Sequence, residues 1–431
     1  MPLFLAAFFS LLAAVLSPVR ALVLPEWWTF AAGLFVLVLA GCLDAGGRGR
    51  ADIALRLSAW LIALLSLYQA FILKSPDITA SLTNPNALAL FTLMLLPLAI
   101  MWKDLFLLGA LIITLVWTQS AAALLALLVT AGFYAKDNMK AEDIRKNWPL
   151  LLLMAVVAAL AVSMLEFRSF LDRLGWWRAA LQMFAASPAL GFGPGSFAYV
   201  YPAFHGTHSS GISTIYVHNY YLEFLAENGF FAFVFWGWAV AARLKDAVGL
   251  KKYALIAVLA HSMTDFGLAV PANFFVFCYL LSAPGPQPAP AAAPASDKKT
   301  SAALAVMALA CFTALCGIFS SQLKLERLRA EALADLSAGD QAGAEGLLED
   351  AARLAPGNPL VPALLGRVRL RAGFDKKDTV GLFTAAVELE RAVVINPYNA
   401  GAWRDLERIY ADVGEQRLLD GLRKRKAEVF R

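Results

Sequence analysis

The residues best suited to chemistry lie in a polar stretch, residues 187–229, with long apolar segments on both sides. It contains three of the four histidines of the chain, His205, His208 and His218. Histidine is the side chain best suited to acid–base chemistry near neutral pH. His205 and His208 have a spacing that metal ligands use, but no third ligand is evident, so we expect no metal. A long polar loop in an apolar chain is typical of a functional region.

A line of polar residues follows His218. At helical spacing Asn219, Glu223 and Glu227 share one face of the segment HNYYLEFLAENG. The carboxylates are candidates for orienting the histidine. A solvated helix face is the equally simple interpretation.

Neighbouring motifs offer groups that bind anions. The turn GFGPGS, which holds Gly193, Gly195 and Ser196, lacks the lysine of a nucleotide-binding loop, yet its backbone N–H groups could hold a phosphate. Arg173 and Arg178 flank a Trp-Trp pair, and the forked guanidinium suits a diphosphate. Interfacial anchoring is the alternative for both arginines.

One ionisable pair lies within an apolar segment. His261 and Asp265 are one helical turn apart. Ionisable groups inside a membrane are costly and often functional. A purely structural hydrogen bond is the other interpretation of this pair.

Composition places these residues in a membrane protein. The chain is 60% hydrophobic and 16% charged, whereas soluble domains are roughly 45–50% apolar and about 25% charged. The net charge of +5 comes from residues in connectors and the C-terminal tail. Such charges report membrane topology, so we expect no nucleic-acid partner. The four cysteines show no spacing typical of a zinc site or a disulfide framework.

The apolar segments predict an all-α, polytopic membrane bundle of about eleven helices, with twelve as the alternative. The segments are residues 3–17, 28–43, 53–73, 87–102, 104–117, 120–135, 149–165, 229–243, 253–268, 270–283 and 302–319. Basic connectors at 46–56, 136–146 and 243–252 are expected in the cytoplasm. The N-terminus is then cytoplasmic, and the loop 166–228 lies outside.

We therefore divide the chain into a membrane domain (1–283), a Pro/Ala-rich cytoplasmic linker (284–301), a last transmembrane helix (302–319) and a soluble helical domain outside the membrane (320–431).

The soluble domain carries an internal repeat. Residues 354–373 superimpose on 395–414, with a Pro/Asn start, an apolar face and a terminal glycine. The tail resembles a tetratricopeptide array of about three α-hairpins, which usually binds a partner protein. A cap that packs on the membrane domain is the alternative.

Four blocks between residues 80 and 283 occur in a characteristic order. They are an Asn-Pro-Asn segment with Asn84 and Asn86, the stretch from Arg173 to Phe197, the segment that begins at His218, and residues 260–277 with His261 and Asp265. Together they resemble the O-antigen ligase and polymerase superfamily. Its members are bacterial membrane enzymes that move glycans from polyprenyl diphosphate carriers.

The resemblance implies an inverting glycosyl transfer that uses neither metal nor cofactor, in the bacterial inner membrane. The donor is then an oligosaccharide on undecaprenyl diphosphate, and the acceptor is lipid A core, a glycan or a protein. Arg173, and second Arg178, would stabilise the diphosphate with help from the N–H groups of Gly193–Ser196. His218 would receive the acceptor proton, oriented by Glu223 or Glu227.

One position departs from the family pattern. Ala121 stands where an arginine is frequent. If that arginine binds the diphosphate, Arg173, Arg178 or Arg168 must replace it. A polymerase or a protein O-oligosaccharyltransferase of the same superfamily stays open. So do two other classes, a transporter of lipid-linked glycans and a non-catalytic assembly scaffold.

Overall fold

The computed structural model describes residues 1–82, 84–140, 167–204, 214–282 and 298–430, with separate positions between 142 and 159. Within these ranges every regular element is helical, as the sequence predicts. The predicted span 149–165 and most of the predicted linker fall outside the described residues, as do the side chains of residues 167–170.

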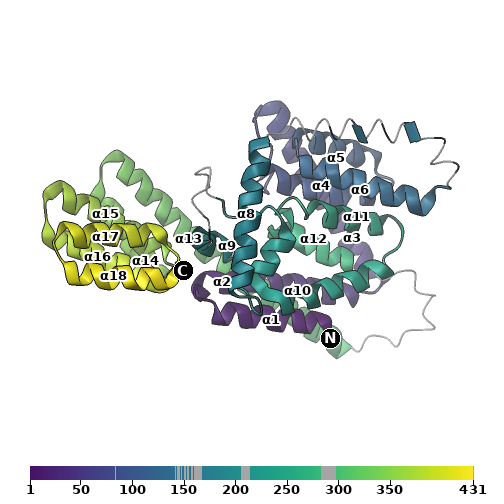
Figure 1. Cartoon of the computed structure of the whole chain (residues 1–431). Coiled ribbons are helices and arrows are strands. Elements are labelled where there is room, and N and C mark those ends of the chain that lie inside the picture. Colours follow the sequence, from purple (N-terminus) through teal and green to yellow (C-terminus); the bar gives the residue numbers. More distant parts are fainter. Residues whose placement is uncertain are drawn as a thin grey trace.

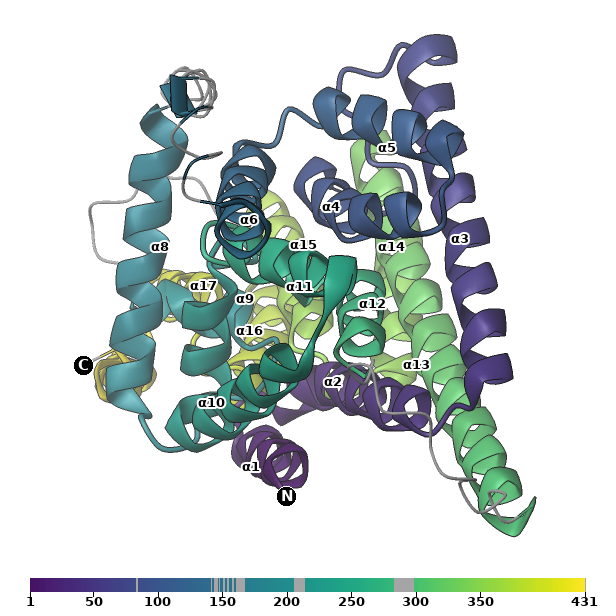
Figure 2. The ribbon, with the colours of Figure 1, turned by 90° about the vertical axis from the view of Figure 1, so that its right-hand side faces the viewer.

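The N-terminal part is a helical bundle (Figure 1). Its elements are α1 (Pro2–Leu16), α2 (Arg20–Gly41), α3 (Ala45–Leu67) with the π-helical turn η1 (Tyr68–Ile72), α4 (Pro85–Met101), α5 (Leu105–Trp117), α6 (Ala121–Asn138), α8 (Phe167–Ala186), α9 (Phe197–Val200), η2 (Tyr201–Ala203), α10 (Tyr220–Asp246), α11 (Gly249–His261), η3 (Gly267–Ala269) and α12 (Pro271–Leu281). Figure 2 shows α11 and α12 between α4 to α6 on one side and α1, α2 and α10 on the other.

The centre of this bundle is α4, which is buried almost all round. Its residues from Ala87 to Leu95 are all buried, and they pack with α11 and α12. A helix that is apolar on every side belongs in the interior of a bundle. The motif that begins at Asn84 therefore lies at the start of the most buried helix of the bundle.

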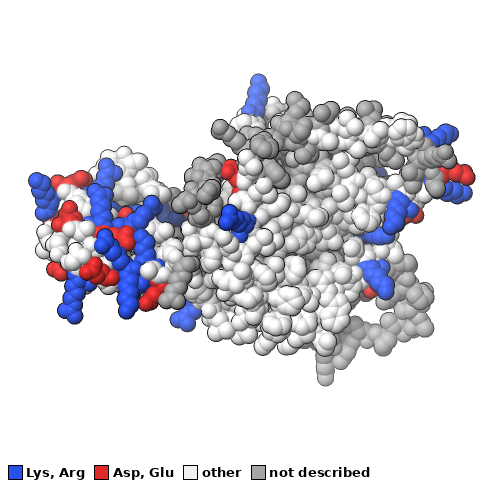
Figure 3. Space-filling model, viewed as in Figure 1, with Lys and Arg blue, Asp and Glu red and all other residues white. Residues whose placement is uncertain are grey.

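Three described helices are long and apolar enough to cross a membrane: Arg20–Gly41, Ala45–Ile72 and Tyr220–Asp246. Shorter apolar helices accompany them, and the face seen in Figure 3 shows few charges over this part of the molecule. The chain is therefore a membrane protein by its apolar helices. The total of eleven or twelve spans stays a prediction.

Described residues of the three basic connectors lie near one another. Lys252 forms an ion pair with Asp137 at 2.6 Å. The hydroxyl of Tyr279 donates to Asp52 at 2.7 Å, and the Lys251 ammonium lies 5.9 Å from the Tyr279 ring centroid. The cytoplasmic position of these connectors stays a prediction.

Two predicted boundaries need correction. The segment predicted to span at 253–268 is helical only to His261, so Asp265 lies in the loop that follows α11. The polar helix that starts near His218 and the predicted span 229–243 form one kinked helix, α10.

The kink in α10 is at Gly229, which has φ +72°. A Cβ there would lie 2.4 Å from the carbonyl oxygen of Ala189. The N–H of Phe230 donates to the carbonyl of Pro188 at 2.9 Å. Only glycine allows such close approach at positive φ. The segment that leads into the Gly-rich turn therefore packs directly against the backbone at the kink of α10.

The C-terminal part consists of α13 (Lys298–Ala338), α14 (Gln341–Leu354), α15 (Leu360–Lys376), α16 (Thr379–Ile395), α17 (Ala400–Asp412) and α18 (Gln416–Val429). The predicted last span, 302–319, is thus the first half of one long helix. Neighbouring helices pack as successive pairs, and charged residues gather on this part (Figure 3).

The internal repeat is visible in the packing of this part. Leu365 and Leu406 are both buried, and Asn358 and Asn399 each accept a backbone N–H at the start of the next helix. Gly373, however, lies inside α15 and not at its end. It is a close-packing position, since a Cβ there would lie 2.8 Å from the side chain of Leu382. The likeness to a tetratricopeptide array stays a prediction.

The C-terminal part contacts the Gly-rich loop. The amide of Asn396 donates to the carbonyl of Tyr199 at 3.4 Å. The ring of Tyr398 lies 5.9 Å from that of Phe192 and 6.4 Å from that of Phe204. Figure 1 shows α13 leading from this side of the bundle into the repeats. The repeat domain therefore packs beside the predicted functional loop.

Candidate functional site

Three segments meet at the loop that follows α11. The carbonyl of Ser262 accepts the N–H of Tyr220 at 3.0 Å, and that of Met263 accepts the amide of Asn219 at 2.9 Å. The carbonyl of Thr264 accepts a hydrogen bond from Arg173 Nη1 at 2.9 Å. Successive carbonyls of this loop thus hold the start of α10 and the middle of α8 together.

Asp265 is at the centre of this meeting point and is fully buried. Its Oδ2 accepts the amide of Asn86 at 2.9 Å and lies 3.4 Å from His218 Nδ1 and 4.0 Å from Arg173 Nη2. Its Oδ1 accepts the N–H of Phe266 at 2.8 Å. Burial acts to raise the pKa of Asp265, but the hydrogen bond from His218 and the nearby cationic groups outweigh it, so that pKa lies below its usual value. Asp265 is therefore a carboxylate.

His218 is held firmly against this carboxylate. Its ring stacks on that of Trp176, with the two centroids 5.1 Å apart. It also forms a T-shaped contact with the ring of Phe266, with centroids 4.9 Å apart. Its backbone has φ +54°, which is uncommon outside glycine. Because a carboxylate only accepts hydrogen bonds, Nδ1 carries a proton in this contact, and Nε2 is the nitrogen left for a substrate.

Arg173 is the arginine that reaches this centre. Its side chain is 21% exposed, and its buried Nε has no hydrogen-bond partner among the described residues. Arg178, five residues later on α8, is exposed and makes no ion pair in the described part of the chain. The side chain of Arg168 lies outside the described part. The structure therefore brings Arg173, and not Arg178, to His218.

The Gly-rich turn does not offer its N–H groups to an anion in this structure. The N–H of Gly195 and that of Phe197 donate to the two oxygens of Glu227 at 2.8 and 2.9 Å. The N–H of Gly193 donates to the Glu227 carbonyl, and that of Ser196 to the Gly193 carbonyl. These amides already bond to the buried carboxyl group of Glu227, which a phosphate would have to displace. The expected phosphate cradle stays a prediction.

Neither Glu223 nor Glu227 contacts His218. Glu223 Oε2 accepts the N–H of Val217 at 2.8 Å. Both glutamates are nearly buried, at 5% and 7% exposure. The predicted polar face of this helix therefore points into the protein, and the group that orients His218 is Asp265.

The predicted asparagines and Ser196 hold backbone and side chains in place. Asn84 caps α4 by accepting the N–H of Asn86, whose own amide reaches Asp265. Asn219 caps α10 by accepting the N–H groups of Tyr221 and Leu222. Ser196 starts α9, is fully buried, and its hydroxyl has no partner in the described residues.

His261 lies next to this cluster but makes no side-chain hydrogen bond with it. His261 is fully buried, and neither ring nitrogen has a hydrogen-bond partner among the described residues. Asp265 thus pairs with His218 and Asn86 and not with His261, one turn earlier. His205 and His208 lie outside the described residues.

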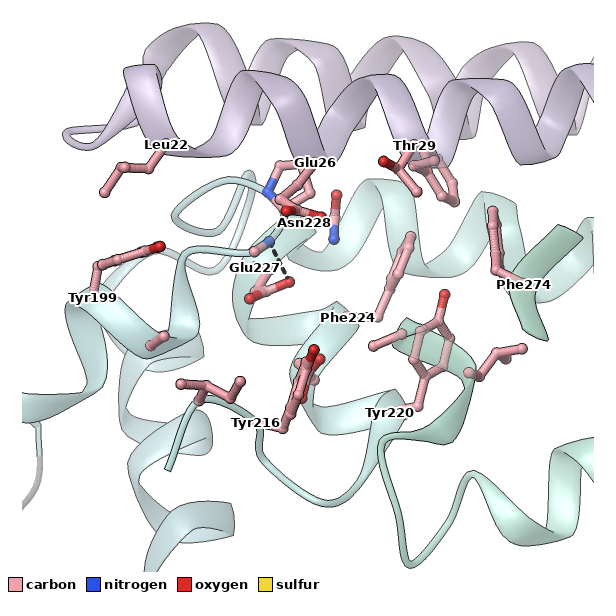
Figure 4. A pocket seen from close by; sticks show the side chains of 18 residues that line it. Leu22, Glu26, Thr29, Tyr199, Tyr216, Tyr220, Phe224, Glu227, Asn228 and Phe274 are labelled. Carbon is pink, nitrogen blue, oxygen red and sulfur yellow. Dashed lines mark hydrogen bonds between the residues drawn. The ribbon is translucent and has the colours of Figure 1, made fainter. Parts of the chain in front are cut away.

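A cavity of about 260 Å³ lies next to this cluster, beneath α2. Tyr216 and Tyr220, on either side of His218 in sequence, line it, but His218 does not. Figure 4 shows Glu26 and Thr29 facing the cavity from α2, opposite the tyrosines. Burial, and next the charge of Glu223, raise the pKa of Tyr216 well above its usual value, so its hydroxyl stays protonated.

Several residues of these two sites were not predicted from the sequence. Trp176 and Phe266 enclose His218, and Glu26 and Asn228 line the cavity. A lone acidic residue in an apolar segment was the available signal for Glu26. For the aromatic residues no local signal separates packing on a histidine from ordinary membrane packing.

Comparison with known proteins adds one finding about the family. Residues 106–237 match the model of a family described as O-antigen ligase. The match runs from α5 into α10 and includes Arg173 and His218, while Asn86 and Asp265 lie outside it. No curated protein matches the chain. The match and the apolar helices support the similarity of this membrane protein to the O-antigen ligase superfamily, whose members are glycosyltransferase-like enzymes.

Proposed function

We propose that this chain transfers an oligosaccharide from undecaprenyl diphosphate to an acceptor hydroxyl at the outer face of the bacterial inner membrane. The observation that carries the proposal is the convergence of Arg173 and His218 on the buried carboxylate of Asp265. Both side chains are held by the protein and are still partly exposed, at 21% and 19%. A fixed cation and a histidine side by side are what glycosyl transfer from a diphosphate needs.

The reaction we propose is a single inverting displacement. The acceptor oxygen attacks the anomeric carbon of the donor, and the bond from that carbon to the diphosphate oxygen breaks. The electron pair leaves with undecaprenyl diphosphate. The acceptor proton moves to Nε2 of His218. The new glycosidic bond joins the acceptor oxygen to the anomeric carbon of the donor sugar.

Asp265 takes the positioning role in this scheme. By accepting from Nδ1 of His218 it keeps Nε2 free for the proton and stabilises the imidazolium that forms. Asn86 and the N–H of Phe266 keep the carboxylate itself in place. These contacts favour Asp265 over Glu223 and Glu227 as the partner of the histidine.

Arg173 stabilises the negative charge that develops on the diphosphate leaving group in this scheme. Its guanidinium is anchored to a carbonyl through Nη1 but keeps donors that Asp265, at 4.0 Å, does not fully use. Arg178 is the second candidate for the diphosphate, as an exposed contact farther along α8. Ala121, in place of an arginine, increases the dependence on Arg173.

Transfer by the purified protein in nanodiscs tests this function. Undecaprenyl-diphosphate oligosaccharide is supplied with lipid A core, a soluble glycan or a protein acceptor in separate reactions. We expect product with one acceptor class, and loss of product in His218→Ala and Arg173→Ala. Gln182→Ala, which changes an exposed residue on α8, is the matched control and should keep full activity.

Two results would overturn the proposal. Equal transfer by wild type and both site variants would remove His218 and Arg173 from the reaction. Absence of transfer by the folded wild-type protein with every acceptor class would favour a transporter or an assembly scaffold. Melting temperatures of all variants, measured in the same nanodiscs, separate loss of chemistry from loss of fold.

A further inference from the structure

Two cavities of this protein share a wall. The cavity of about 260 Å³ beneath α2 is lined by Leu22, Glu26 and Tyr199, and so is a second cavity of about 430 Å³. The second lies between α2 and the repeat domain, where Gln322 of α13 and Asn358 of the α14–α15 turn line it. The two spaces therefore lie side by side and lead from the repeat domain toward the segment that carries His218.

The first cavity contains buried polar groups without protein partners. Tyr220 is only 8% exposed, and its hydroxyl makes no hydrogen bond with any described residue. Asn228 is 2% exposed and uses Oδ1 to accept from Ser10, which leaves its two N–H donors unused among the described residues. Figure 4 shows both side chains beside the space that they line. Buried polar groups are almost always satisfied, so these groups need a polar partner inside the cavity, either water or a ligand hydroxyl that replaces it.

The mixture of groups points to a sugar. Glu223 offers an oxygen that Val217 does not use, so acceptors and donors stand together in the cavity. Phe224 and Phe274 add apolar ring faces to the same wall. A sugar ring presents hydroxyl groups around its edge and C–H groups on its faces, which fits such a lining. The volume is just under the roughly 300–1,000 Å³ of pockets for drug-sized ligands, which suits one ring.

The lining offers no cation to an acidic sugar. Glu26, Glu223 and Glu227 line the first cavity and Glu26 and Glu326 the second, while no lysine or arginine of the described residues lines either one. A carboxylate or phosphate on the ligand would lose water in this space without gaining a cationic partner. Anions are instead favoured at Arg173, outside both cavities.

We propose that the two cavities form one groove for a glycan without acidic groups, in which the first holds a terminal sugar ring and the repeat domain supplies the outer half. The inference rests on the proposed function, because it takes the glycan to be acceptor or product of the same transfer. It gives the repeat domain a role within this molecule, as part of the glycan-binding site.

Binding of soluble oligosaccharides to the full chain in nanodiscs, without donor, tests the groove. The probes are tetramers of a neutral hexose, of N-acetylglucosamine and of galacturonic acid. Saturation-transfer NMR measures the binding of each one. We expect at least one of the first two to bind, and the uronate to bind about tenfold more weakly or not at all, because its carboxylates would lose water without meeting a cation.

Paired variants locate the binding. Tyr220→Phe removes only the unpartnered hydroxyl, and Ser321→Trp fills the second cavity, so each should weaken binding about tenfold. Ser320→Trp is the matched control, because the neighbouring serine on α13 does not line either cavity. It should bind as wild type does.

The outcomes separate this inference from the proposed function. No binding of either uncharged tetramer, preferred binding of the uronate, or equal binding by wild type, Tyr220→Phe and Ser321→Trp would overturn the groove. Transfer activity with no such binding would leave the function and remove the groove. Binding that depends on Tyr220 and Ser321 in a protein without transfer activity would do the reverse.

Discussion

The Asp265 cluster and the neighbouring cavity both bury carboxyl groups in an apolar helical bundle, but different donors bond to them. Asp265 faces the side chains of Arg173, His218 and Asn86. Glu227 faces the backbone N–H groups of Gly195 and Phe197. Side-chain donors keep further N–H groups or a free ring nitrogen for a substrate, whereas the backbone N–H groups have none to spare. The Asp265 cluster is thus suited to catalysis, whereas Glu227 is suited to holding the backbone of the Gly-rich turn in place.

The largest difference between the two centres should follow from Asp265→Asn. The amide leaves the ring of His218 free to adopt the other tautomer and removes the charge beside Arg173. We expect transfer to fall about 10³-fold, within the range for loss of acid–base catalysis, while melting changes little. Initial rates against Asp172→Asn, an acid on α8 without an ion pair in the described residues, measure the effect. A loss under tenfold would contradict the positioning role.

Gly191→Ala tests the backbone that shapes the second centre. Gly191 has φ +68°, and a Cβ there would lie 2.4 Å from the carbonyl oxygen of Glu227. We expect the free energy of unfolding in detergent to fall by about 2 kcal/mol or more. Gly237→Ala, on α10 with open space around it, should change stability by less than ~1 kcal/mol. Equal effects would show that the turn does not lock into the kink of α10.

The two cavity glutamates should respond unequally to the same change. In Glu227→Gln one of two N–H donors loses its acceptor, so we expect about 1–3 kcal/mol of destabilisation. In Glu223→Gln the remaining oxygen still accepts from Val217, and the loss should stay below ~1 kcal/mol. Thermal unfolding of both variants makes the comparison. A larger loss for Glu223→Gln would reverse the structural order of the pair.

The smallest effect on transfer should come from Trp176→Phe at the first centre. The indole stacks on His218 at 5.1 Å, and phenylalanine keeps an aromatic face there. We expect a loss of roughly 0.5–1.5 kcal/mol in transfer free energy of activation, less than about tenfold to fifteenfold in rate. Trp28→Phe, at an exposed tryptophan of α2, is the control. A loss comparable to that of Asp265→Asn would assign Trp176 a direct role in substrate contact.

The sequence by itself determined the helical membrane character, the polar stretch around His218 and the matching halves of the tail. These features are local, because each depends on residues of a single helix. Examples are apolar runs, caps and the repeated positions Leu365 and Leu406. The ends of helices were harder to predict. Gly373 looked like a helix end but is instead a packing position, since the decisive contact is with Leu382 on the next helix.

Only the tertiary structure decided which polar groups meet. Asn86 and Asp265 are 179 positions apart and their side chains form one hydrogen bond, while the ring of His261, four residues before Asp265, forms none among the described residues. The amides of the Gly-rich turn belong to Glu227, which no spacing in the sequence indicates. Local patterns fix which face of a helix is polar. Which partner that face meets depends on how distant helices pack, because each buried charge must find its donors across the bundle.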